Sequence, residues 1–148
     1  MSIFDIFGKR KGNKDNRTLK RAVGDLGEEA ACKYLVSHGY KIIDRNVRIS
    51  HKELDIIAED DYHIVVVEVK TLSQTREQAQ QHGQRASEHI DREKALNLLS
   101  AAKYYTAANY NGKTPRIDVI EVYLGGGTPE LVHTENAVNH RTLYRHRR

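Results

Sequence analysis

Two apolar segments of the chain, Leu54–Ala58 and His63–Lys70, each carry one acidic residue in their interior. The second segment is rich in β-branched residues and the polar pair Asp60–Asp61 separates the two, so we expect a β-hairpin. Pairing about this turn places Asp55 directly opposite Glu68. Opposed residues point to the same face of a sheet with Cβ atoms about 4.5–5.5 Å apart, and two carboxylates held that close repel each other unless a cation lies between them.

Lys70 lies two residues beyond Glu68, so the period of two predicts that it shares the same face. Carboxylate oxygens on rigid strands suit Mg²⁺ or Mn²⁺, and a neighbouring ammonium can stabilise charge on a phosphate under attack. The alternative is a cross-strand salt bridge on a solvated sheet face. Charges inside otherwise apolar strands are costly to bury, which favours a functional role for Asp55, Glu68 and Lys70.

The rest of the chain alternates between helical and strand-like spacing. Apolar residues three and four apart predict helices, and alternating apolar residues predict strands. The expected helices are Leu19–Ser37 and Asp91–Asn109, and the further expected strands are Tyr40–Ile49, Arg116–Leu124 and a short Leu131–Thr134. The polar stretch Ser73–Ser87 is interpreted as a loop. This order (α-β-β-β-α-β) predicts an α/β domain: a mixed, mainly four-stranded sheet with the hairpin at its centre and helices flanking it.

Charge is distributed unevenly along the chain. Residues 1–21 hold seven Lys or Arg and two Asp, and residues 140–148 hold four Arg and no acid, so the ends carry +9 while residues 22–139 carry −5. We interpret residues 1–18 as a basic flexible tail, residues 19–139 as one domain and residues 140–148 as a second basic tail. The tails could attract nucleic-acid phosphates, although the acidic middle is unusual for a DNA-binding protein.

Several classes of protein are excluded. The longest apolar run, Ile64–Val67, is too short to cross a bilayer, and we expect no membrane partner. A single cysteine, Cys32, cannot form an internal disulfide, and the N-terminus lacks the pattern of a secretory signal, so we expect a cytoplasmic protein. Gly125–Gly127 precedes no helix, which argues against a P-loop, and the eight His residues form no zinc motif.

A wider set of residues resembles a known family, the YraN-like proteins. These small bacterial proteins are similar to PD-(D/E)XK nucleases of the restriction-endonuclease superfamily, and in particular to archaeal Holliday-junction resolvases. The resemblance covers about residues 24–137. It is carried by the matches Gly24-Asp-Leu-Gly-Glu28 with Ala31 and Tyr34-Leu35, Gly39-Tyr40, Arg45-Asn46, Glu53-Leu-Asp-Ile-Ile-Ala58, Val67-Glu-Val-Lys-Thr71, Lys94 with Leu98 and Ala101-Ala102, Arg116-Ile-Asp-Val119, and His133 with Asn136-Ala137.

The resemblance implies a restriction-endonuclease-like fold with Asp55 and Glu68 as metal ligands and Lys70 in the catalytic-lysine role. It also implies that Glu28 of the first helix faces the same cleft, although Glu28 could equally be a solvated helix-surface acid. Lys94 and Arg116 match basic positions that could contact DNA phosphates. An ion pair with Asp91 or Asp118 would explain these two residues about as well.

The chain departs from the family pattern at three places. Lys52 stands where many members have Gly, Leu72 stands where a basic residue often occurs, and the Gln-rich loop Ser73–Glu88 is longer. The metal-site residues are intact. These departures put in doubt any substrate contact that the family makes through this loop.

The leading hypothesis for function is a Mg²⁺- or Mn²⁺-dependent endonuclease that hydrolyses phosphodiester bonds of DNA, in particular branched or damaged DNA. One alternative is a catalytically inactive nucleic-acid-binding or adaptor protein with a nuclease-like fold in repair, recombination or uptake. Another is a protein-interaction module whose tails bind an acidic partner. A homodimer is left open by the sequence.

Overall fold

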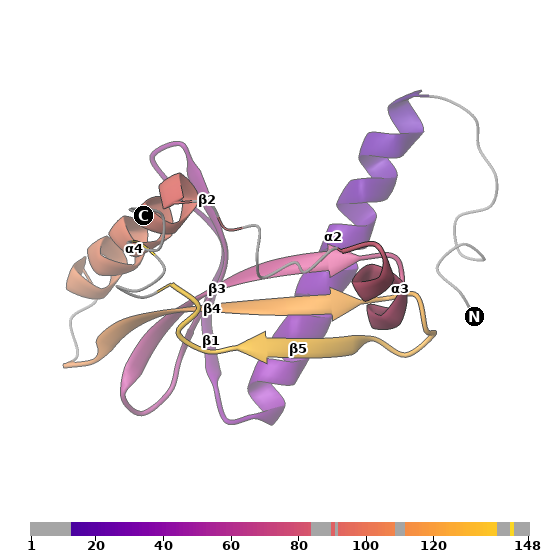
Figure 1. Ribbon diagram of the computed structural model, residues 1–148. Helices are drawn as coiled ribbons and strands as arrows, with labels where there is room; N and C mark the ends of the chain where they lie inside the picture. Colours follow the sequence, from indigo (N-terminus) through magenta and orange to yellow (C-terminus); the bar gives the residue numbers. More distant parts are fainter. Residues whose placement is uncertain (1–12, 84–89, 91, 109–111, 139–142, 144–148) are drawn as a thin grey trace.

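The computed structural model describes residues 13–83, 90, 92–108, 112–138 and 143 (Figure 1). The elements in chain order are α2 (Asn13–Ser37), β1 (Lys41–Ile49), β2 (Lys52–Glu59), β3 (His63–Leu72), α3 (Arg76–Gln81), α4 (Arg92–Ala108), β4 (Thr114–Tyr123) and β5 (Glu130–Thr134). The fold is α/β, as predicted. No helix within the described ranges is long and apolar enough to cross a membrane.

The five strands form one mixed sheet in the order β1-β2-β3-β4-β5. β3 and β4 are parallel and all other neighbours are antiparallel. Parallel neighbours need a long crossover connection, and α3 and α4 lie within the one that joins β3 to β4. The second strand of the predicted hairpin, β3, is the central strand of the sheet, which contains one strand more than the four principally expected.

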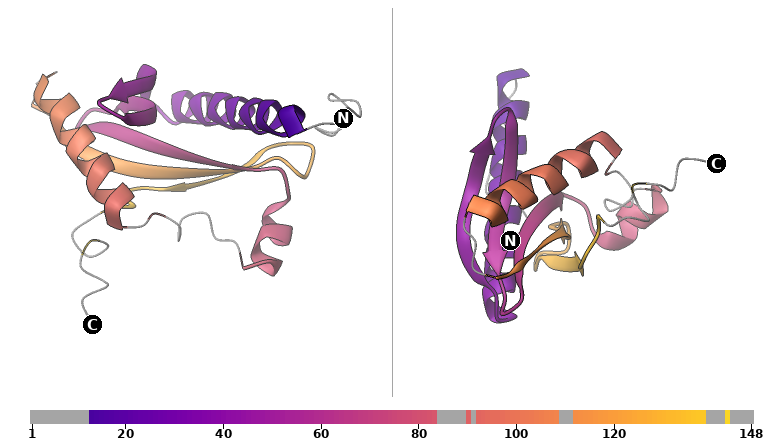
Figure 2. Two further views of the ribbon diagram at one scale, coloured as in Figure 1. Left: turned by 90° about the horizontal axis from the view of Figure 1, so that it is seen from above. Right: turned by 90° about the vertical axis from the view of Figure 1, so that its left-hand side faces the viewer.

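Helices cover both faces of the sheet, as the left view of Figure 2 shows. The side chains of β3 alternate between the two faces: Val65 and Val67 pack in the cluster that includes α2, while Ile64 and Val66 pack in the cluster that includes α4. This alternation follows from the period of two along a strand. Continued along β3, it places Glu68 and Lys70 on the face covered by α4.

Two predicted boundaries differ from the structure. α2 begins at Asn13 rather than at Leu19. The stretch interpreted as a loop, Ser73–Ser87, contains the short helix α3, whose first turn is closed by a capping box. Thr75 Oγ1 accepts a hydrogen bond from Gln78 N at 3.1 Å, and Gln78 Oε1 accepts one from Thr75 N at 2.9 Å. The Thr-x-x-Gln pattern was the available sequence signal for this helix.

Some predictions fall outside the described residues. Asp91, the first residue of the expected helix Asp91–Asn109, is one of them, as are residues 1–12 and most of the expected C-terminal tail. The division into a domain and two basic tails stays a prediction.

Candidate active site

The predicted carboxylate pair lies where β2 and β3 separate. Their pairing runs from Glu59–Ile64 to Ile56–Val67, the register predicted from the sequence. Beyond Ile56, β2 continues beside β1 to Lys52, while β3 continues beside β4 to Leu72. Figure 1 shows the β1–β2 end rising toward α4 and leaving β3. We call this divergence the strand fork; Asp55 and Glu68 are the first residues beyond the last pair.

Asp55 bridges the strand fork with its side chain. Its Oδ2 accepts a hydrogen bond from the backbone N–H of Val69 at 2.8 Å. In an unbroken antiparallel ladder this N–H group would donate to a backbone carbonyl of the neighbouring strand. Here it donates to the Asp55 carboxylate instead. This bond fixes Asp55 beside the strand that carries Glu68 and Lys70.

Glu68 is buried and contacts two lysines. Lys70 Nζ lies 3.4 Å from Glu68 Oε1, which confirms that the two side chains share a face. Lys94 Nζ, from α4, donates a hydrogen bond to the same oxygen. Lys94 therefore belongs to this group and pairs with Glu68, which is neither of the acids considered from the sequence.

A sequence signal for the position of Lys94 was available. Leu98 and Ala101, four and seven residues further along α4, are buried against the sheet. Residues at these spacings share one side of a helix, so Lys94 extends the apolar side of α4 and faces the sheet. The sequence alone did not indicate which acid Lys94 would contact, because the position of α4 relative to β3 depends on tertiary packing.

The charges of the group shift two pKa values strongly. Burial, together with the nearby charge of Glu68, raises the pKa of Asp55 to about 7, against the lowering effect of the Val69 hydrogen bond. Burial works to lower the pKa of Lys94, but its hydrogen bond and charge interaction with Glu68 outweigh that effect and raise it. Lys94 therefore stays protonated, while Asp55 carries its charge at an energetic cost.

Glu28 lies on α2 next to the point where this helix closely approaches β3. A Cβ atom at Gly27 would overlap the Thr71 side chain, so only glycine allows this approach. Burial raises the pKa of Glu28, and the charge of Glu28 in turn contributes to the raised pKa of Asp55. The charges of Arg45 and Glu53 and a side-chain hydrogen bond with Asn46 also act on Glu28, and its role beside the carboxylate pair stays a prediction.

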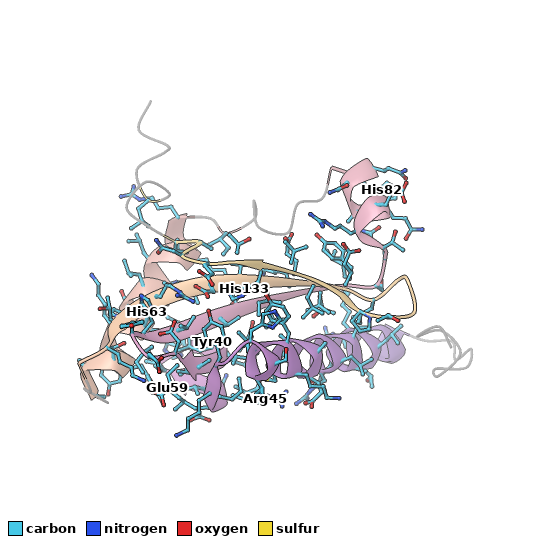
Figure 3. The ribbon with its side chains drawn as sticks, turned by 90° about the horizontal axis from the view of Figure 1, so that it is seen from below. Tyr40, Arg45, Glu59, His63, His82 and His133 are labelled. Atoms are coloured by element: carbon cyan, nitrogen blue, oxygen red, sulfur yellow. The ribbon has the colours of Figure 1, made fainter. Side chains whose placement is uncertain are left out.

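Arg116 has a different environment. Its Nε and Nη2 each donate to a carboxylate oxygen of Asp118 at 2.8 Å, the ion pair that the sequence allowed as an alternative. Asp118 is fully buried and also lies 2.7 Å from His133 Nε2. Arg116 Nη2 donates a second bond to Tyr40 Oη at 2.8 Å. We call these four residues the Asp118 network, and the labels of Tyr40 and His133 mark it in Figure 3.

The Asp118 network gives several of the matched family residues a structural role that requires no catalytic function. Hydrogen bonds from His133, Arg116 and the backbone of Asn136 outweigh the effect of burial and lower the pKa of Asp118. The network satisfies the buried charge and ties β4 to the segment that follows β5. A contact between Arg116 and DNA stays a prediction.

The donor set at the strand fork fits a hard divalent cation. The described residues contain no group of three or more His, Cys, Asp or Glu side chains placed to hold a metal, and the two carboxylates predicted from the sequence are Asp55 and Glu68. Mg²⁺ is commonly held by one or two carboxylates and completes its shell with waters and substrate phosphates. Burial and the charge of Glu68 raise the pKa of Asp55, so a cation beside it would favour its ionised form. A cation at this place would relieve the repulsion between the two carboxylates.

A pocket of about 170 Å³ lies beside this group. It opens between β2 and α4, and its lining residues are Lys52, Glu53, Leu54, Lys94, Asn97 and Leu98. Lys94 belongs both to this lining and to the Glu68 contact. Asp55 and Glu68 are not among the lining residues, so Lys94 is the link between the pocket and the carboxylate pair.

Comparison with known sequences matches residues 27–122 to the model of a family described as "Uncharacterised protein family UPF0102". A UPF0102 protein of Caldanaerobacter subterraneus is 38% identical over 122 residues, which cover 82% of this chain and 92% of the relative. One from Clostridioides difficile is 40% identical over 102 residues, or 68% of this chain and 84% of the relative. One from Fervidobacterium nodosum is 33% identical over 130 residues, or 86% and 90%.

Proposed function

This chain belongs to the UPF0102 family, the YraN-like proteins, and on the basis of its strand fork we propose that it is a metal-dependent endonuclease acting on DNA. The observation that carries the proposal is the arrangement of Asp55, Glu68 and Lys70 on one face of two diverging strands. Paired carboxylates beside an ammonium are the groups that phosphodiester hydrolysis needs.

Asp55 and Glu68 would hold the metal ion. A Mg²⁺ or Mn²⁺ ion there would supply Lewis-acid activation of a phosphate oxygen and of water. Asp55 is held in place for this role by the Val69 N–H, and Glu68 is oriented by Lys94. Because two separate elements supply these contacts, both carboxylates stay fixed when substrate arrives.

Lys70 and Glu28 have complementary roles in the proposal. Lys70 is half-buried and lies 3.4 Å from Glu68, so its ammonium stands next to any phosphate that reaches the carboxylate pair. There it would stabilise the negative charge that develops on the phosphate during attack. Glu28, whose pKa is raised by burial, can accept a hydrogen bond from the attacking water and take up its proton.

The proposed partner is DNA. The +9 charge of the chain ends supports attraction to phosphates, since each phosphate neutralised by Lys or Arg releases condensed counterions. Within the proposal the substrate is branched or damaged DNA. Substrate contacts inherited through the Gln-rich stretch Ser73–Glu88 are not part of the proposal.

A cleavage panel tests the proposal. Labelled single-stranded, duplex, flap and four-way-junction DNAs are incubated with Mg²⁺, Mn²⁺ or a chelator, and the native protein is compared with Asp55→Asn. We expect metal-dependent cleavage by the native protein alone. Cleavage by both proteins would indicate a contaminating nuclease. Tight binding without cleavage under every metal condition would overturn the enzymatic proposal.

One observation favours a second candidate, a binding or adaptor protein with a nuclease-like fold. Glu68 already contacts both Lys70 and Lys94, so its charge is compensated without a metal ion. Such a protein would bind the same DNAs but would not bind Mn²⁺. Isothermal titration with Mn²⁺ therefore separates the two candidates independently of the cleavage assay.

A further inference from the structure

Gly24 lies inside helix α2, and no contact with the described residues requires a glycine at this position. Glycine is the least favourable residue in a helix interior after proline. Gly27, one turn away, is explained by the approach of Thr71, but a Cβ atom at position 24 would meet no atom within 4 Å. Gly24 also has no positive φ that would require glycine. The space above Gly24 is therefore open, although it costs the helix stability.

Gly24 lies on the side of α2 that leads to Glu28. Residues 17, 21, 24 and 28 follow one another at spacings of four, three and four, which places them on one side of a helix. Further along α2, Ala31 and Leu35 continue the same side and are buried on the sheet. One side of α2 therefore changes character along the helix. Near the C-terminal end it is apolar and packs on the sheet; toward the N-terminal end it presents Glu28, then Gly24, then arginines.

The sheet does not cover this part of the helix. Figure 1 shows the N-terminal half of α2 projecting past the edge of β3, on the side where β2 has left β3. Arg17, Lys20 and Arg21, which we call the basic turns, are exposed there. No ion pair joins any of the three to another residue that the structure describes.

We propose that the backbone of a DNA strand lies along this side of α2, crosses closely over Gly24, and reaches the carboxylate pair beside Glu28. The missing side chain lets a sugar–phosphate backbone approach the helix, and the basic turns neutralise the phosphates on the far side of the crossing. Arg17 and Glu28 are about 16 Å apart along a helix axis, enough for several nucleotides. The identity of the occupant rests on the proposed function.

A second copy of the chain fits this surface less well. A symmetric contact through Gly24 would bring the basic turns of two copies together, and like charges at close range repel. The polyanionic backbone of DNA instead complements three exposed cations that have no ion pair among the described residues. Charge therefore favours DNA over self-association.

The test uses fluorescence anisotropy of a labelled DNA duplex and a four-way junction of the same sequence, in chelator, with the full chain. Gly24→Ala should raise the melting temperature by about 3 °C, because alanine stabilises a helix. The same variant should weaken DNA binding, and Gly24→Leu should weaken it by about tenfold or more, since the leucine side chain would occupy the space of the crossing strand. A glycine kept only for folding would not combine a gain in stability with a loss of binding.

Charge variants provide an independent readout. Replacing Arg17 and Arg21 together by Gln should reduce the slope of log affinity against log salt by about 1.8, the value for two phosphate contacts on duplex DNA. Lys33→Gln is the matched control, since Lys33 is exposed on the opposite side of α2 and should leave the slope unchanged. Lys33→Leu likewise controls for an exposed leucine side chain on the helix.

The possible results are separable from the fate of the nuclease proposal. Native affinity in Gly24→Leu, or a native salt slope in the arginine variant, would overturn the track along α2 even if Asp55-dependent cleavage is found. A change in oligomeric state of Gly24→Leu by light scattering, with DNA affinity intact, would also overturn it. Loss of binding in these variants would support the track even if no DNA is ever cleaved.

Discussion

Asp55→Asn should make the metal-free protein more stable at pH 8 while removing its activity. Asp55 is ionised at a cost, because burial and the charge of Glu68 raise its pKa from 3.8 to about 7. Asparagine has nearly the same shape, and its Oδ1 can still accept the hydrogen bond that Val69 N donates to Asp55. The substitution therefore removes the unfavourable charge and keeps the contact across the strand fork.

The magnitude follows from the pKa shift. Each pKa unit corresponds to about 1.36 kcal/mol, so a rise from 3.8 to about 7 sets a ceiling of about 4 kcal/mol. Water access and local relaxation around this partly exposed carboxylate lower that ceiling, and the attraction of Lys94 for the charge is lost. We expect Asp55→Asn to gain about 1–2 kcal/mol in free energy of unfolding at pH 8.

The sign with pH is fixed by linkage. The folded-state pKa of Asp55 is raised, so the unfolded chain loses this proton first as pH increases. The contribution of Asp55 to stability is thus fully present below about pH 4, declines as pH rises, and is lost above about pH 7. The advantage of Asp55→Asn should accordingly grow from pH 5 to pH 8.

Urea denaturation followed by circular dichroism, in chelator at pH 5 and pH 8, measures this difference. Asp61→Asn is the matched control, because Asp61 is an exposed acid in the turn between β2 and β3. Saturating Mg²⁺ should then stabilise the native protein and leave Asp55→Asn unchanged, since only the native pair binds the ion. If Asp55→Asn is destabilised equally at both pH values, the account of a strained carboxylate is wrong.

Further predictions concern other parts of the molecule. Lys70→Ala should lower the cleavage rate by about 10²–10³ with DNA affinity almost unchanged, and single-turnover kinetics beside anisotropy would check this. Asp118→Asn should cost about 3–5 kcal/mol at pH 7 by urea denaturation, because it leaves the largely buried guanidinium of Arg116 unpaired. That cost should shrink as pH falls below 3.8 toward the lowered folded-state pKa of Asp118, where the native stabilisation is lost. Gly27→Ala should lower the melting temperature by about 5 °C or more, since its methyl group would overlap Thr71, and an unchanged value in a thermal scan would contradict that packing. Removing residues 1–12 should flatten the salt dependence of duplex binding, because Lys and Arg there exceed acids.

The sequence alone was enough to predict which residues of the hairpin oppose each other, and hence the pairing of Asp55 with Glu68. The period of two along β3 and the length of the turn before it are local properties, and together they specify which residues of β2 and β3 oppose each other. The register found from Ile56–Val67 to Glu59–Ile64 is the predicted one, and Lys70 contacts Glu68 as expected. The two covering helices were equally readable, because each buries one apolar side.

Only the tertiary structure decided what surrounds that pair. Lys94 reaches Glu68 from 26 residues further along the chain, and Gly27 lets α2 approach Thr71 of β3 closely. The strand fork itself arises because β2 follows β1 while β3 follows β4. Local spacing says which side of an element is buried, whereas the partner on that side depends on how the elements pack, and packing is set by the whole core at once.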